Sequence, residues 1–288
     1  MVGNNGWNYK SGDKIGQNKL HIQVIADFGG GLTTDHAFEE VRNHFFRYDT
    51  SHLIRAVSEH PVFAFSTIET GFWIAQMGLH SDHPGLVIFS NTAPRGDMKW
   101  LGENTQRFVC GILDNGIPLF AVNTGYSLSF VKDRLKGLWE VKVPNEGTQF
   151  RSRDYYPEAT MAILKGELSR IGKEVDIKKI SAIPNFAVAS VDGYGNLKTT
   201  IFKSQLSSTI LNSKILRVSI NGTSNFVFNT LTGEKGVTGD LCLFVGSSGG
   251  KKRSFLEIVK LQERAADAFK IAGPRDDLGK IRIESVRV

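Results

Sequence analysis

Cysteine and long apolar runs are both scarce in this sequence. The 288 residues include two cysteines, Cys110 and Cys242, and each lies inside an apolar run. They are too few for a disulfide scaffold and are not spaced as zinc ligands, so we expect two small buried hydrophobes. No apolar stretch reaches the roughly 20 residues of a membrane span, and residues 1–20 read as a polar tail rather than a secretory signal. We therefore expect a cytoplasmic location.

Basic residues only slightly outnumber acidic residues in this sequence. The formal net charge is +6, from 35 Lys and Arg against 29 Asp and Glu. The acidic residues are spread along the chain and the densest basic cluster, Lys251-Lys252-Arg253, is short, so neither a nucleic-acid nor a membrane partner is expected. A basic surface would also attract an anionic small molecule.

Metal-ligand spacing is absent, although all seven histidines lie within the first 83 residues. None forms a His-x-x-x-His pair or another usual ligand pattern. The nearest approach, His80-Ser81-Asp82-His83, precedes Pro84 in an expected loop. We expect no metal.

The first half of the sequence alternates short strands with amphipathic helices. A β-branched run at 21–27 ends at an acid and is followed by Gly29-Gly30-Gly31. A helical pattern comes next, with Phe38, Val41, Phe45 and Phe46 on one face. Strand, glycine loop and helix are a typical α/β opening. Further strands are expected at 62–65, 86–89, 108–113, 119–122 and 138–143, and helices at 69–79 and 156–171.

After roughly residue 175 the pattern changes to short alternating strands. These are expected at 187–191, 198–202, 214–220, 225–229, 241–245 and 255–261. Turn signals recur every 8 to 12 residues or so, which is typical of a small β-barrel or sandwich. The sequence therefore predicts an α/β sheet domain over 21–178 and a small C-terminal β-barrel domain over 179–288.

Asp27 stands where the first strand gives way to the glycine loop. A carboxylate there can accept hydrogen bonds from both hydroxyls of a ribose, and the glycines let a ligand approach the backbone. The alternative is a turn-forming aspartate. Asp35 likewise is either a helix cap or a partner for an ammonium group.

Three other polar segments could hold a ligand. Arg151 and Ser152 open the second long helical pattern, where they either position a polar or anionic group or form a capped, salt-bridged first turn. Asn196 lies in an Asp-Gly-Tyr-Gly-Asn turn, and Ser247-Ser248 precede Gly249-Gly250. A structural turn explains both segments, but their amide and hydroxyl groups also suit a zwitterionic amino acid or a base.

Taken in order, these segments resemble the S-adenosyl-methionine hydroxide adenosyltransferases, the superfamily that includes the fluorinases and chlorinases. The similarity runs from about Ile22 to Ala266. It is carried by Asp-Phe-Gly with Thr-Thr-Asp (27–29 and 33–35), Pro-Gly-Leu-Val (84–87), Asp-Asn-Gly-Ile (114–117), Phe-Arg-Ser-Arg-Asp (150–154), Asp-Gly-Tyr-Gly-Asn-Leu-Lys-Thr (192–199) and Phe-Leu-Glu-Ile (255–258) with Ala-Ala at 265–266.

The resemblance implies a homotrimer with ligands at subunit interfaces and S-adenosyl-methionine as the substrate. Asp27 would hold the ribose hydroxyls, and Asp35 with Asn196 the methionine moiety, with Ser247 and Ser248 nearby. In this superfamily a water, hydroxide or halide attacks the ribose C5′ and displaces methionine.

The water-activating residues of the superfamily are matched incompletely. Hydroxide-type members use an Asp, an Arg and a His, but Arg151 occupies the His position. The Asp aligns with Ala93, or with Asn91 in a shifted alignment. Arg95 is the candidate for the Arg, and Ser152 is similar to the halide-contacting serine of the halogenases.

Two main functions remain open from these residues, beside a third, which is a basic interaction protein on the same scaffold. The first is an S-adenosyl-methionine-cleaving enzyme that yields adenosine and L-methionine, with Arg95, Arg151 and Ser152 as catalytic candidates. The alternative is a non-catalytic protein that binds S-adenosyl-methionine or a nucleoside.

Overall fold

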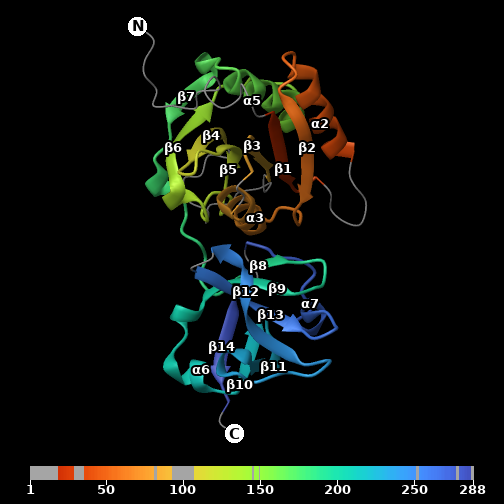
Figure 1. Ribbon diagram of the computed structural model, residues 1–288, viewed down its shortest axis with the longest axis vertical. Helices are drawn as coiled ribbons and strands as arrows, with labels where there is room; N and C mark the ends of the chain where they lie inside the picture. Colours follow the sequence, from red (N-terminus) through yellow and green to blue (C-terminus); the bar gives the residue numbers. More distant parts are fainter. Residues whose placement is uncertain are drawn as a thin grey trace. The chain divides into compact units, whose positions relative to one another are not determined.

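The fold is known from a computed structural model, which describes residues 19–28, 36–80, 83–92, 107–144, 146–148, 150–250, 253–276 and 279–286. The chain divides into two units, Met1–Ala182 and Ile183–Val288. The first is a mixed α/β unit and the second is built on a β-sheet (Figure 1). This is the two-domain α/β class that the sequence predicts.

The first unit contains a seven-stranded sheet in the order β2-β1-β3-β5-β4-β6-β7. The first four strands of this order run parallel, and β4 runs antiparallel to both β5 and β6. The strands are β1 (Leu20–Ala26), β2 (Ile54–Pro61), β3 (Leu86–Asn91), β4 (Arg107–Leu113), β5 (Pro118–Asn123), β6 (Leu135–Val141) and β7 (Ile171–Glu174).

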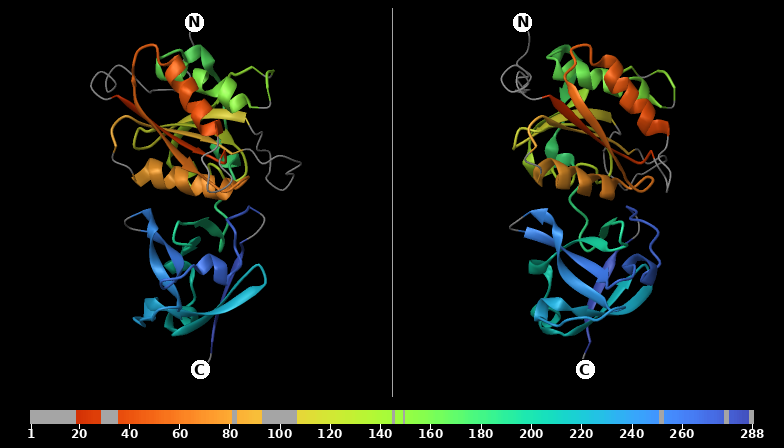
Figure 2. Two further views of the ribbon diagram at one scale, coloured as in Figure 1. Left: turned by 90° about the vertical axis from the view of Figure 1, so that its right-hand side faces the viewer. Right: turned by 45° about the vertical axis from the view of Figure 1, so that its right-hand side comes forward.

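Helices cover both faces of this sheet (Figures 1 and 2). Phe38, Val41 and Phe45 of α2 join a buried cluster with residues of α5, whereas Ile74 of α3 packs with the opposite face. The helical segments are α2 (His36–Tyr48), α3 (Thr67–His80), α4 (Arg151–Asp154), α5 (Tyr156–Leu164) and the short 3-10 turns η2 (Lys132–Arg134), η3 (Leu168–Arg170) and η4 (Ile177–Lys179).

Three sequence expectations for this unit are wrong. Phe46, expected on the buried face of α2, is 47% exposed. The strand expected at 62–65 is a loop, because the preceding residues 54–61 form β2 instead. The helix expected over 156–171 ends at Leu164, since Gly166 adopts φ +96° and turns the chain toward β7.

The second unit also contains seven strands, in the order β14-β10-β11-β12-β13-β9-β8. The bridge Ala187–Lys280 and the hydrogen bond from Val188 N to Gly279 O (2.9 Å) link segments at its two edges, so the sheet curls into a half-barrel. Its elements are β8 (Val188–Val191), β9 (Leu197–Phe202), η5 (Lys203–Gln205), α6 (Ser208–Asn212), β10 (Ile215–Ile220), β11 (Thr223–Asn229), η6 (Thr230–Thr232), β12 (Leu241–Gly250), β13 (Arg253–Lys260), α7 (Ala265–Ala268) and β14 (Ile281–Ser285).

Both cysteines are buried free thiols, as the sequence predicts. Burial raises the pKa of Cys110 to about 12 and also raises the pKa of Cys242, so neither is a ready nucleophile. Among the helices of the described residues, none has the length and apolar character needed to cross a membrane.

Candidate functional site

The carboxyl end of β1 is a topological switch point of the first sheet. From β1 the chain passes through α2 to β2 on one side, and β3 pairs with the other side of β1. In open α/β sheets, ligands bind outside the carboxyl ends of the strands where the strand order reverses in this way. Asp27 directly follows β1 and is therefore placed where a ligand is expected.

The Asp27 carboxylate also holds the loop between β2 and α3. Its Oδ2 accepts a hydrogen bond from Phe65 N at 2.9 Å. Phe65 has φ +63°, a left-handed conformation that a bulky residue rarely adopts. Phe63 and Phe65 in this loop are 37% and 53% exposed. One carboxylate and two exposed aromatic rings thus lie at one edge of the sheet, a combination that suits a diol and a planar base.

Helix α4 lies beside the end of β1. The rings of Phe28 and Phe150 meet edge to face with centroids 5.3 Å apart. Because Phe150 immediately precedes Arg151 and Ser152, the contact brings the segment that carries these two candidates against the one that carries Asp27. Ser152 is buried.

Arg151 is engaged with a neighbouring buried phenol. Burial raises the pKa of Tyr156, and the charge of Arg151 together with its hydrogen bond to the phenol oxygen opposes that rise. The Tyr156 ring also stacks on Phe108, with centroids 4.0 Å apart. A guanidinium has donor groups only, so Arg151 can orient a polar or anionic group here but cannot accept a proton.

Polar side chains buried at the start of α3 support this edge of the sheet. Glu69 Oε2 accepts a hydrogen bond from Phe63 N at 2.7 Å. The hydroxyls of Thr70 and Thr92 lie 2.7 Å apart, and Tyr126 N donates to Thr67 Oγ1 at 2.8 Å. Sequence reasoning missed Glu69, although an acid in the first turn of a helix is a usual sign of interaction with nearby backbone N–H groups.

Two expected site residues, Asp35 and Arg95, lie outside the described residues. Their proposed contacts with the methionine moiety and with the attacking water therefore stay predictions.

The other three predicted ligand contacts, Asn196, Ser247 and Ser248, belong to one polar network in the second unit. Asp192 Oδ1 accepts hydrogen bonds from the backbone N–H groups of Tyr194 and Asn196, both at 3.0 Å, and its Oδ2 accepts one from Asn196 Nδ2 at 3.1 Å. This closes the turn between β8 and β9 and fixes the Asn196 amide.

Lys198 connects that turn to the β12–β13 pair. Its Nζ lies 3.6 Å from Asp192 Oδ2 and 3.1 Å from Glu257 Oε1. Glu257 Oε1 also accepts from Ser247 N at 3.0 Å and from Ser248 Oγ at 3.2 Å. The network thus runs from Asn196 through Lys198 to both serines.

Sequence reasoning missed Lys198 and Glu257 as parts of this network. Both are only 7% exposed. A signal was present, because each is a single charge inside an otherwise uncharged strand segment, Leu-Lys-Thr-Thr-Ile and Phe-Leu-Glu-Ile-Val. Buried charges of opposite sign are usually paired.

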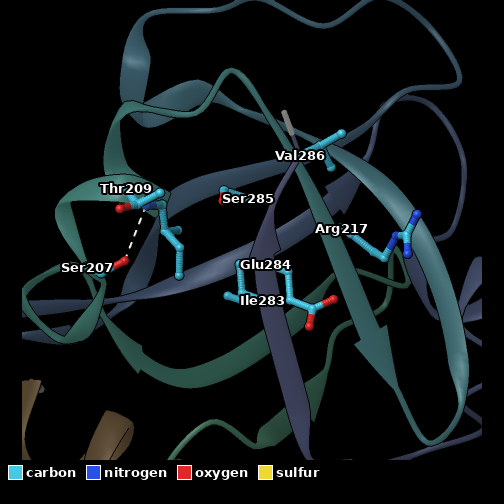
Figure 3. A pocket seen from close by; sticks show the side chains of 8 residues that line it. Ser207, Thr209, Arg217, Ile283, Glu284, Ser285 and Val286 are labelled. Atoms are coloured by element: carbon cyan, nitrogen blue, oxygen red, sulfur yellow. Dashed lines mark hydrogen bonds between the residues drawn. The ribbon is translucent and has the colours of Figure 1, made fainter. Parts of the chain in front are cut away.

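A separate hollow of about 580 Å³ lies between α6 and β14 (Figure 3). Its charged groups already have partners, since Arg217 stacks on Phe226 and Glu284 pairs with Arg282. Ser207 Oγ accepts from Ile210 N at 3.3 Å, the dashed line in Figure 3. None of the predicted site residues lines this hollow.

Within the part of the chain that the structure describes, no group of three or more His, Cys, Asp or Glu residues could hold a metal ion.

No protein-family model and no curated protein matches this chain. Solved structures do match it. One is the crystal structure of an uncharacterized conserved protein from Thermotoga maritima, with a TM-score of 0.64 and 17% sequence identity, over 91% of this chain and 100% of that one. At this identity the likeness shows a shared fold and no more.

Proposed function

We propose that this protein cleaves S-adenosyl-methionine, with water attacking the ribose C5′ to give adenosine and L-methionine. The observation that carries the proposal is the Asp27 carboxylate at the carboxyl end of β1, at the switch point of the sheet. The resemblance of six segments in order along the chain to the hydroxide adenosyltransferases supplies the reaction. The proposal includes that the second unit is the small C-terminal β-barrel domain of that superfamily.

This cleavage reaction does not require a strong acid or a strong base from the protein. A C–O bond forms at C5′ as the C–S bond breaks, the sulfonium leaves as a neutral thioether, and the attacking water releases one proton to the solvent. Alignment of water, C5′ and sulfur is therefore the main requirement. We assign Asp27 to the ribose diol, Arg151, Ser152 and Arg95 to the side of the attacking water, and Asp35, Asn196, Ser247 and Ser248 to the methionine moiety.

The test is incubation of the purified protein with S-adenosyl-methionine, followed by chromatography. Adenosine and methionine should appear in equal amounts. Asp27→Asn should weaken substrate binding and so lower the rate below saturating substrate, because an amide oxygen accepts weaker hydrogen bonds than a carboxylate. It should leave the fold intact, because an asparagine oxygen can still accept from Phe65 N. Absence of product over hours, with ligand binding intact, would overturn the catalytic proposal.

A non-catalytic S-adenosyl-methionine or nucleoside binding protein is the second candidate, and the surroundings of Arg151 favour it. Hydroxide-type members have a histidine at this position, whereas Arg151 is an arginine whose charge acts on the buried Tyr156 phenol. Calorimetric binding of S-adenosyl-methionine without turnover would support this candidate, and absence of affinity for S-adenosyl-methionine, adenosine and methionine would exclude it.

The proposal includes a homotrimer with ligands at subunit interfaces, as the resemblance implies. It also places the reaction in the cytoplasm, where two free buried thiols are in keeping with a reducing environment.

A further inference from the structure

The Ser247–Ser248 segment departs from regular strand geometry. Register between β12 and β13 shifts between Val245 and Gly249, which marks a bulge in β12. Bulges redirect side chains and occur often beside functional sites. Here the shift separates Ser247, which is exposed, from Ser248, which is 3% exposed.

Glu257 fills the space behind the bulge. Its Oε1 accepts hydrogen bonds from Ser247 N, Ser248 Oγ and Lys198 Nζ, all within 3.2 Å. Gly246 packs directly on the same side chain, since a Cβ added there would lie 2.5 Å from Glu257 Cδ. The bulge therefore takes its shape from this one carboxylate.

Lys198 joins the bulge to the Asn196 turn. It pairs with Glu257 across β9 and β13 and reaches Asp192, which fixes both the backbone and the amide of Asn196. The Asn196 turn and the bulge of β12, which are distant in sequence, are thus held by a continuous set of charge-assisted contacts.

Stability alone does not explain why Lys198 and Glu257 are buried as a charged pair. Two charges lose much of their hydration energy when buried, and an apolar pair of similar size is often equally stable or more so. A charged pair does, however, fix the direction of the hydrogen bonds around it more strictly than apolar packing can.

We propose that Glu257 and Lys198 are positioning residues, which set the Ser247–Ser248 bulge and the Asn196 turn in the geometry that receives the amino-acid end of the ligand. This inference rests on the proposed function, because it takes the methionine moiety as the group received by Asn196, Ser247 and Ser248. Neither residue contacts the reacting atoms.

The experiment is calorimetric titration of the full-length protein with S-adenosyl-methionine and, separately, with adenosine. Glu257→Gln keeps the side-chain shape and removes the charge. Its affinity for S-adenosyl-methionine should fall roughly ten- to thirtyfold, while its affinity for adenosine stays at the wild-type value, because adenosine lacks the amino-acid end. Glu284→Gln, which neutralises a partly exposed glutamate on β14, is the matched control and should change neither affinity.

The double variant Lys198→Met with Glu257→Gln serves if the single variant does not fold, because it leaves no uncompensated charge in the interior. It should show the same selective loss. Wild-type affinity for S-adenosyl-methionine in a folded variant, or equal losses for both ligands, would overturn this inference alone. If the wild-type protein binds neither ligand, the proposed function fails and the inference fails with it.

Discussion

His60 is a partly buried histidine whose protonation opposes folding. It packs against Trp73 with ring centroids 4.4 Å apart, and burial lowers its pKa to about 4. In the unfolded chain a histidine titrates near 6.5. Below that pH the unfolded chain binds more protons than the folded protein, so stability is lost as the pH falls from about 6.5 toward 4.

The expected loss from His60 is on the order of 3 kcal/mol by pH 4. Thermal melts of the wild-type protein and of His60→Leu, taken from pH 7 to pH 4, measure it. The variant should lose less stability than the wild type over this range. Parallel curves for His60→Leu and wild type would contradict the assignment.

Gly246 lies directly against the Glu257 side chain at the bulge of β12. A methyl group there would overlap Glu257, so Gly246→Ala should lower the free energy of unfolding by about 1–3 kcal/mol. Gly193→Ala is the matched control, because nothing lies within 4 Å of a Cβ at that position. Denaturant unfolding of both variants would show a loss in the first alone, and equal stabilities would refute the packing account.

At the scale of elements, the end of α5 depends on Gly166. Its φ of +96° lies in the left-handed region, and no atom lies within 4 Å of an added Cβ, so only backbone strain opposes a side chain there. Gly166→Ala should therefore cost about 1–2 kcal/mol of stability. Thermal denaturation measures this, with Gly193→Ala again as control, and an unchanged melting temperature would argue against a strained turn.

Most elements followed from periodicity, and the exceptions have local causes. Leu86–Asn91 and Thr67–His80 match their expected strand and helix because their patterns are long and their ends well marked. The loop 62–65 has an apolar composition that predicts a strand, but β2 is formed by the preceding residues 54–61, and Phe65 N donates to the Asp27 side chain instead of to a strand. Contacts between residues distant in sequence cannot be read from periodicity.

The candidate site, like the helices and strands, could be predicted from the sequence only in part. Asp27 could be found from its place at the end of a strand, and Asn196 from its turn motif. The link between Asn196 and Ser248 could not, because it passes through Lys198 and Glu257, which lie 59 residues apart in sequence. Only the folded sheet shows that these two residues are neighbours.

At the scale of the whole molecule, the charge is divided unevenly between the units. Residues 1–182 contain 20 Lys and Arg and 20 Asp and Glu, whereas residues 183–288 contain 15 and 9. The second unit thus carries the entire positive excess, which favours an approaching carboxylate such as that of a methionine moiety.

The proposed trimer makes a prediction at this scale. Light scattering after size exclusion should give three times the chain mass of 31.8 kDa. If ligands bind at subunit interfaces, S-adenosyl-methionine should strengthen the association at low protein concentration. A monomer with full affinity for the ligand would contradict interface sites.

The central claim is that Asp27 holds a ribose diol, and one calorimetric comparison tests it most directly. Adenosine and 2′-deoxyadenosine are titrated into the wild-type protein and into Asp27→Asn. The wild type should prefer adenosine by roughly tenfold, the value of one charge-assisted hydrogen bond, and the variant should lose most of this preference. The same preference in both proteins would show that the carboxylate serves only its loop.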